Sequence, residues 1–336
     1  MNGKTFLATT GAHHGEASLA RAEYDDKGSW IVDFLMDDYD VRCLTADPLH
    51  DDIVYAGTQG NGVLRSIDGG RTWEPAGLPG QIIKSLAVSP HNPEIIYAGV
   101  KPASIFKSQD SGRSWQELEG FLRIPGRKIW FSPAEKPYQA YVQAITISPS
   151  TPGTILAGIE FGAVVRSTNG GATWSGHLRG ALRDCHDLIF HASDGNWVYE
   201  AGGSGGGASV SRDSGRSWQK RKDGLAKNYG VACAADPIRP EVWYVSVAPG
   251  PGKAYGSNPE AYFYRAIEGE DWQPIGWESH PMKQMPIALV TDPGHAGHLY
   301  AGTTDGDVWF SAEYGDTWQQ LPFNLKGIFR CLIMLG

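Results

Sequence analysis

The stretch that decides the fold is SIDGGRTW, residues 66–73, in which a serine, an aspartate, a glycine and a tryptophan stand at fixed positions. The phrase recurs along the chain. Its good copies are SQDSGRSW (108–115), STNGGATW (167–174), SRDSGRSW (211–218) and SAEYGDTW (311–318). Two degenerate copies, DDKGSW (25–30) and IEGEDW (267–272), complete the set of seven. The seven final tryptophans are 42 to 59 residues apart, which is the length of a four-stranded propeller blade.

Each good copy follows short strand patterns that repeat with it. Before the first copy, VRCLTADP (41–48) has apolar residues and ends at Asp-Pro, and DIVYAGT (52–58) ends at Ala-Gly and Thr58. Such runs, bounded by turn residues, predict short strands rather than helices. The chain is therefore expected to be all-β and to form a single domain over residues 1–336.

The two ends of the chain complement each other. The N-terminal part supplies only the later strands of a blade, expected at residues 5–9, 17–23 and 30–34. The C-terminal stretch 328–333 supplies only a first strand, and its Arg-Cys-Leu copies residues 42–44. Together the ends make one shared blade, which closes a seven-bladed β-propeller and leaves no bare sheet edge.

The phrase S-x-D-x-G-x-[ST]-W resembles the Asp-box of the BNR-repeat propellers, a superfamily that includes sialidases, other BNR-repeat glycoside hydrolases, sortilin-type receptors and photosystem II assembly propellers. The resemblance covers nearly the whole chain, and it implies the propeller fold. In the box the aspartate accepts turn N–H groups and the glycine supplies a positive φ. The resemblance implies either a carbohydrate-active enzyme or a non-catalytic binding or assembly scaffold.

Charge and composition narrow the class of partner. The formal net charge is −8, so nucleic acid and anionic membranes are not expected partners. No apolar run is long enough to span a membrane, and the start of the chain lacks a signal-peptide pattern. The cysteines lie far apart without a CxxC motif, and we expect buried thiols at Cys43, Cys185, Cys233 and Cys331. These features predict a cytoplasmic protein that is a monomer or a weak oligomer.

The loops of a propeller fall on two faces, and here they differ in length. The turns between first and second strands are short, as in residues 47–52 and 292–297. The loops on the other face are long, as in residues 120–141 and 248–260. Long loops on a rigid scaffold usually carry binding, so this second face is expected to be the working face. His295 and His298 belong to the short set and are interpreted as a polar turn.

Aligning the first strands predicts a ring of equivalent residues around the centre of the working face. In blade order the ring is Arg42, Lys84, Gln143, Asp187, Val231, Ile287 and Arg330. The first two and the last belong to adjacent blades and form a basic arc that suits an acidic small molecule or glycan. Asp37, Asp38 or Asp40 could neutralise that arc internally. Other ligand-binding candidates from the loops are His13, His14 and Lys101.

Two enzyme classes and one binding class fit these residues. A sialidase-like glycosidase would use an arginine triad, but sialidases have six blades, and the Arg-Ile-Pro at residues 123–125 falls in an insertion. A polysaccharide lyase would use histidine and tyrosine as base and acid. A scaffold would use the surface aromatics of the long loops. The candidate catalytic residues are Asp187, His186, Tyr229 and Glu160. No cofactor is expected, with a metal held by His13, His14 and His186 as the alternative.

Overall fold

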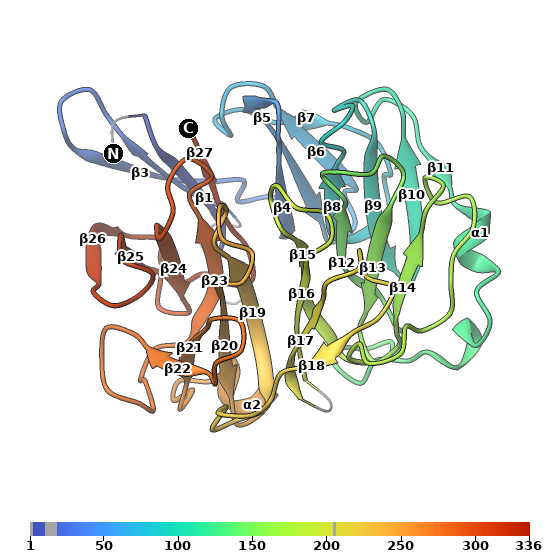
Figure 1. The fold of residues 1–336 in the computed structure, drawn as a ribbon. Coiled ribbons are helices and arrows are strands. Elements are labelled where there is room, and N and C mark those ends of the chain that lie inside the picture. Colours follow the sequence, from blue (N-terminus) through green and yellow to red (C-terminus); the bar gives the residue numbers. More distant parts are fainter. Residues whose placement is uncertain (1–2, 11–18, 204–205) are drawn as a thin grey trace.

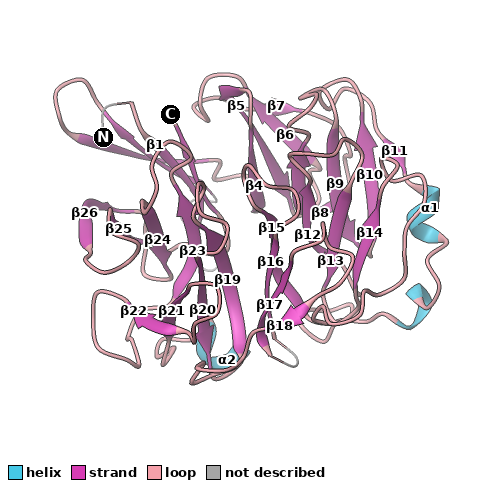
Figure 2. Cartoon of the chain, viewed as in Figure 1, coloured by secondary structure: helices cyan, strands magenta, loops and turns pink. Residues whose placement is uncertain are grey.

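The computed structural model describes residues 3–10, 19–203 and 206–336. These residues form seven antiparallel sheets arranged in a ring, as Figures 1 and 2 show. Six sheets have four strands and one has three. The all-β class and the seven-bladed propeller are thus confirmed.

Within each blade the strands follow one another outward from the centre. The innermost strands are β4 (Val41–Asp47), β8 (Ile82–Val88), β12 (Val142–Ile147), β15 (Cys185–Phe190), β19 (Tyr229–Ala235), β23 (Pro286–Thr291) and β27 (Leu332–Leu335). The second strands are β5 (His50–Thr58), β9 (Ile96–Lys101), β13 (Ile155–Ile159), β16 (Val198–Gly202), β20 (Trp243–Ala248), β24 (Leu299–Thr303) and β1 (Thr5–Thr9). We number the blades 1 to 7 in this order.

The outer half of each blade is shorter. The third strands are β6 (Val63–Ser66), β10 (Ser104–Ser108), β14 (Val164–Ser167), β17 (Gly207–Ser211), β21 (Tyr262–Ala266), β25 (Asp307–Ser311) and β2 (Leu19–Tyr24). The outermost strands are β7 (Glu74–Pro75), β11 (Gln116–Glu117), β18 (Gln219–Lys220), β22 (Gln273–Ile275), β26 (Gln319–Asn324) and β3 (Trp30–Leu35). The helical elements are α1 (Glu119–Leu122), a 3-10 turn (Arg127–Ile129) and α2 (Pro251–Ala254). None of the described helices is long and apolar enough to cross a membrane.

Strands from the two ends of the chain close the ring. β27 pairs with β1 in antiparallel register, with Leu332 opposite Ala8 and Leu335 opposite Thr5. β27 also contacts the inner strands β23 and β4 of the two neighbouring blades. The shared blade predicted from the copied Arg-Cys-Leu is therefore confirmed, although its inner strand is Leu332–Leu335 and not residues 328–333.

Blade 3 lacks a regular fourth strand because side chains replace backbone carbonyls as acceptors. The N–H of Arg166 donates to Ser175 Oγ at 2.9 Å, and the N–H of Val164 donates to His177 Nδ1 at 3.2 Å. Burial lowers the pKa of His177 to about 4, so the imidazole is neutral and can accept this bond. The segment therefore follows β14 without forming a ladder.

The repeated phrase forms the turn between third and fourth strands. In the first copy, Asp68 accepts the N–H groups of Arg71 at 3.0 Å and Thr72 at 2.9 Å, and Gly70 N–H donates to Ser66 Oγ. Gly70 has φ of +83°, and a Cβ there would lie 2.8 Å from the Leu7 side chain of blade 7. The copy thus needs a glycine for its backbone and for its contact with the preceding blade.

The repeated turns lie on the same face as the short first-to-second-strand turns. The same backbone bond joins the two turns in five blades, for example Gly69 N–H to Asp52 O at 2.9 Å and Ser111 N–H to Glu94 O at 3.0 Å. The long loops are consequently on the opposite face, as predicted, and we keep the name working face for it.

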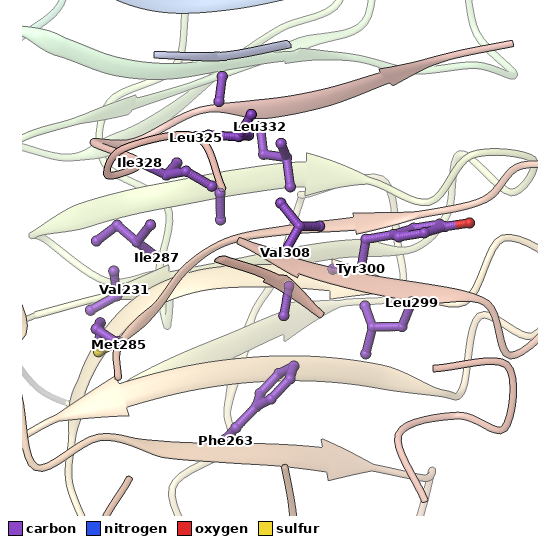
Figure 3. Close-up of a cluster of buried hydrophobic side chains, with 14 of the residues drawn as sticks. Val231, Phe263, Met285, Ile287, Leu299, Tyr300, Val308, Leu325, Ile328 and Leu332 are labelled. Carbon is purple, nitrogen blue, oxygen red and sulfur yellow. The ribbon is translucent and has the colours of Figure 1, made fainter. Parts of the chain in front are cut away.

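Apolar side chains fill the spaces between neighbouring sheets. Figure 3 shows the largest cluster, in which Leu332 of β27 packs with Ile328, Ile287 and Val308. Leu335 of the same strand belongs to a separate cluster with blade 1. The four cysteines are free thiols; Cys331 is partly buried and the other three are buried, in line with the sequence-based expectation.

Candidate functional site

A central cavity of about 530 Å³ runs along the innermost strands. At its working-face end the inner strands of blades 1 to 6 each carry a one-residue β-bulge. Arg42 lies between Val41 and Cys43, which pair with Thr58 and Gly57, and Lys84 has the same position in blade 2. A bulge re-aims one side chain, and here it turns one residue per blade toward the centre. We call this end of the cavity the mouth.

The bulges identify the residue that each blade contributes to the mouth. They confirm Arg42, Lys84, Gln143, Val231 and Ile287, all of which line the cavity. In blade 7, Phe329 N–H donates to Thr9 O and Thr9 N–H donates to Cys331 O, which leaves Arg330 as the bulged residue.

In blade 4 the sequence alignment was wrong by one residue. The bulge lies between Cys185 and Asp187, so His186 takes the ring position assigned to Asp187. The Asp187 carboxylate instead accepts the backbone N–H groups of Leu188 and Cys233, both at 2.9 Å. Asp187 thereby links blades 4 and 5, and its hydrogen bonds make it a structural residue of the cavity wall.

Lys84 and Lys101 share one carboxylate from the long loop between blades 2 and 3. Lys84 forms an ion pair with Glu135, and Lys101 Nζ lies 3.3 Å from the same carboxylate. Both lysine side chains are buried. Burial lowers the pKa of Lys84 to about 8, with Arg330 and Arg42 adding to the effect and Glu135 opposing it. Neither lysine is therefore available as an unpaired cation for a ligand.

Arg42 is also paired within the protein. Its guanidinium forms an ion pair with Asp40, two residues earlier in the chain, and lies 5.8 Å from the centre of the Phe329 ring. Of the three aspartates proposed to neutralise the basic arc, Asp40 does so. The prediction that three free cations converge on one ligand is thus wrong for Arg42 and Lys84.

Arg330 differs from the other two cations. No carboxylate of the described residues lies within 4.0 Å of its guanidinium, which donates from Nη1 to Gln143 Oε1 at 2.7 Å. Its Nε is buried without a hydrogen-bond partner among those residues. Burial opposes the charged form, but Tyr141, Tyr255 and Glu160 raise the pKa of Arg330, so it stays a cation. Gln143 holds it in place by donating in turn to His186 O at 3.3 Å.

Three groups that can exchange protons or bind a cation gather beside Arg330. Glu160 follows β13, Asp184 precedes β15, and His186 is the bulged residue of blade 4; their side-chain donor atoms all lie within 4.8 Å of one another. Glu160 and Asp184 are buried, at 6% and 2% exposure. Burial raises the pKa of Glu160 to about 7, with Asp184 adding to the effect and His186 and Arg330 opposing it.

Two tyrosines complete this side of the mouth. The Tyr229 ring lies 4.7 Å from that of His186, and Tyr255, just after α2, lines the cavity. Tyr255 is 46% exposed, whereas burial raises the pKa of the Tyr229 hydroxyl, which therefore carries its proton at neutral pH. Gly203 allows the close packing, since a Cβ there would lie 2.1 Å from Asp184 Oδ2 and 2.9 Å from the Tyr229 ring.

The structure therefore brings together most of the predicted site residues. Gln143, Glu160, His186, Tyr229 and Arg330 meet on one side of the mouth, and Arg42, Lys84 and Lys101 lie in internal ion pairs beside it. His13 and His14 fall outside the described residues.

Sequence reasoning missed Asp184, Tyr255 and Glu135. Asp184 stands two residues before His186, and Tyr255 lies in a loop already expected to matter. Glu135 reaches Lys84 from the long insertion between blades 2 and 3, which no sequence spacing indicates.

An exposed aromatic rim lies beside Glu160. Phe161 has φ of +48°, a conformation that bulky residues rarely adopt, and it is 37% exposed. Its ring lies 6.3 Å from that of Phe131, which comes from the long loop between blades 2 and 3 and is 54% exposed. These rings give the mouth an apolar border on the side of blade 3.

The histidines on the opposite face form a polar turn. His295 Nδ1 lies 3.1 Å from Asp292 Oδ2, and the rings of His295 and His298 stack at 4.6 Å. These three residues also have the spacing of a metal site, but Lys4 already forms an ion pair with Asp292. The Arg-Ile-Pro at residues 123–125 is also unrelated to the mouth, because Arg123 is exposed and pairs with Glu119.

No protein-family model matches the chain, and no curated protein matches it in sequence. Solved structures do match in fold. The GH74 xyloglucanase from Xanthomonas campestris is 19% identical with a TM-score of 0.72, over 95% of this chain and 52% of that one. The chain spans about half the length of the GH74 structures. At this identity the likeness establishes the fold alone.

Two solved structures of similar chain length also match in fold. YCF48 bound to D1 peptide is 14% identical with a TM-score of 0.58, over 83% of this chain and 80% of that one. A putative 6-phosphogluconolactonase from Bacteroides uniformis is 13% identical with a TM-score of 0.66, over the full length of both chains. The chain is thus a β-propeller whose structural neighbours include both glycoside hydrolases and a peptide-binding propeller. Membership of the Asp-box families stays a prediction.

Proposed function

We propose that this chain is a carbohydrate-active enzyme, a polysaccharide lyase or glycoside hydrolase, that binds an acidic sugar at the mouth of its central cavity. The observation that carries the proposal is Arg330. It is a half-buried guanidinium with no carboxylate within 4.0 Å among the described residues, and it faces a cavity large enough for a sugar. A guanidinium suits a carboxylate because it can donate two parallel hydrogen bonds.

The neighbours of Arg330 favour chemistry rather than binding alone. A sugar whose carboxylate contacts Arg330 and Gln143 would place its ring beside His186, Tyr229 and Tyr255, and the two tyrosine hydroxyls can give or accept protons. An arginine that neutralises the carboxylate makes the adjacent C–H more acidic, which is the requirement of an eliminating lyase. Val231 and Ile287 would contact the uncharged side of the sugar.

Hydrolysis by two carboxylates is less well supported. Such enzymes place the two groups on either side of the glycosidic bond. Here Glu160 and Asp184 lie together on one side of the mouth, and both are buried. The GH74 structures are about twice as long as this chain, and the likeness to them covers only half of their length.

The test is a thermal-shift screen with uronic acids, oligouronates, sialic acid and matched neutral sugars, followed by product analysis for a conjugated double bond or a new reducing end. We expect only carboxylated ligands to raise the melting temperature, through mass action. Arg330→Gln should abolish the effect, and Arg123→Gln, at an exposed pair on α1, should leave it unchanged. Equal stabilisation of wild type and Arg330→Gln, or no stabilisation by any acidic sugar, would overturn the proposal.

A second function follows from the aromatic rim. A peptide with a free C-terminal carboxylate could use the same Arg330, with apolar side chains against Phe131 and Phe161. The likeness to YCF48 bound to D1 peptide gives this binding-scaffold function its support. Peptides and their C-terminal amides separate the two functions, since only the scaffold binds the free-acid peptide more tightly than the acidic sugars.

A further inference from the structure

We propose that Glu160, Asp184 and His186 form a binding site for one divalent transition-metal ion, such as Mn²⁺ or Zn²⁺, at the mouth. Two carboxylates and one imidazole are a mixed oxygen and nitrogen set that these ions accept. The donor atoms lie within 4.8 Å of one another. Ligands about 2.1 Å from a common ion are up to about 4.2 Å apart, so small side-chain rotations complete the site.

The hydrogen bond of His186 fixes which nitrogen is free to bind. Its Nδ1 lies 2.6 Å from Gly230 O, and because a carbonyl can only accept, Nδ1 carries the proton. Nε2 then points toward Asp184 Oδ1, 3.5 Å away. A lone pair facing a carboxylate requires a cation or a second proton between them. A metal-binding histidine typically donates its other N–H to a backbone carbonyl or carboxylate, as His186 does.

Glu160 is the second, independent indication of a ligand. It is only 6% exposed, and its carboxylate interacts with His186, Arg330 and Lys84 by charge alone, without a hydrogen bond from the residues that the structure describes. A buried carboxylate without a partner is costly unless a cation compensates it. Its neighbour Asp184 is a second buried carboxylate at the same place, and one divalent ion would bind both.

The surroundings leave room for the ion and for a ligand. His186 lines the central cavity, which gives the ion a route from solvent. The cations facing the cluster are Arg330 and Lys84, and Lys84 is already neutralised by Glu135. Three protein ligands leave coordination positions open, which is the arrangement of a catalytic rather than a structural site.

The role of the ion toward a ligand rests on the proposed function. An ion on Glu160, Asp184 and His186 beside Arg330 would let the two cations flank one sugar carboxylate. Ion binding itself needs no sugar, so the two proposals can be tested separately.

The experiment measures ion binding to the full chain without sugar. Protein treated with a chelator and dialysed is titrated with MnCl₂ and ZnCl₂ by calorimetry, and ion content is then measured after gel filtration. We expect one ion per chain in wild type. Glu160→Gln and His186→Ala should each weaken binding at least as much as the loss of an outer-shell partner does, about 10- to 100-fold.

Two control variants separate ion binding at the mouth from binding on the opposite face and from sugar binding. His295→Ala removes the polar turn on the opposite face and should leave the ion bound. Arg330→Gln should also retain the ion while losing the sugar, so failure of the function leaves this inference standing. Glu160→Gln is nearly isosteric and removes a buried charge, so it should melt no lower than ion-free wild type. No ion bound to wild type, unaltered affinity in Glu160→Gln, or loss of the ion in His295→Ala would overturn the inference.

Discussion

The ring closure by β27 predicts a large loss of stability from one truncated side chain. Leu332 is 5% exposed and packs against Ile328 and Gly302 across the boundary between blades 6 and 7. Leu332→Ala removes three carbon groups, worth about 0.8 kcal/mol each on transfer to water, and leaves a cavity that adds to the cost. We therefore expect a decrease of about 3 kcal/mol in the free energy of unfolding.

Leu335 gives a second and separate measure of the same strand. It is 6% exposed and packs in the cluster shared with blade 1. Leu335→Ala should cost a similar amount, and the two losses should add because the side chains belong to different clusters. The double variant would then lose roughly half of the free energy of unfolding, which is about 5–15 kcal/mol for a typical folded domain.

Urea unfolding followed by tryptophan fluorescence measures these changes. Leu49→Ala is the matched control, since Leu49 is 56% exposed in a turn of blade 1 and should change stability by less than about 0.5 kcal/mol. If β27 did not close the ring in solution, Leu332→Ala would cost as little as Leu49→Ala. That result would refute the closure.

Two further predictions concern charged residues of the scaffold. Asp68→Ala should cost about 1–2 kcal/mol, the scale of a lost turn hydrogen bond, whereas Asp68→Asn should cost less because Asn169 accepts the equivalent N–H of Thr173. Burial raises the pKa of Asp68, but hydrogen bonds from Thr72 and Ser66 outweigh it and lower the pKa to about 2. Wild type should therefore be more stable than Asp68→Asn by its full margin above about pH 4, and this margin should disappear toward pH 2. Urea midpoints of the two proteins that differ by the same amount at pH 4 and at pH 2 would contradict this. Burial lowers the pKa of Lys84 to about 8 in the folded protein, so the unfolded chain keeps this proton to higher pH. The free energy of unfolding of wild type should therefore rise by about 2 kcal/mol between pH 8 and pH 10 relative to that of Lys84→Met. Parallel urea midpoints for Lys84→Met and wild type across that range would show the lysine to be unperturbed.

The sequence was sufficient for the fold because the repeated phrase and the strand patterns around it agree. The tryptophan spacing predicted the blades, and the copied Arg-Cys-Leu predicted the pairing of β27 with β1. The faces could also be predicted, because short turns and long loops alternate along the chain. These features are local, so one sequence is enough to detect them.

The site could be predicted only in part, because it depends on register and on long-range pairs. A single bulged residue exchanged Asp187 for His186 at the ring position, since a shift of one residue in a strand turns the side chain to the other face. The ion pair of Asp40 with Arg42 could be predicted, because the two residues are only two positions apart in the sequence. The pair of Lys84 with Glu135 is different, because it joins a strand to an insertion whose path the sequence does not specify.

The most direct test of the central claim is calorimetric binding of the best acidic sugar from the screen to wild type and to Arg330→Gln. Removing one partner of a desolvated charge pair costs about 2–4 kcal/mol, so the account predicts affinity roughly 30- to 1,000-fold weaker in the variant. The corresponding neutral sugar should bind both proteins with the same low affinity. An acidic sugar that binds Arg330→Gln as tightly as wild type would contradict the account.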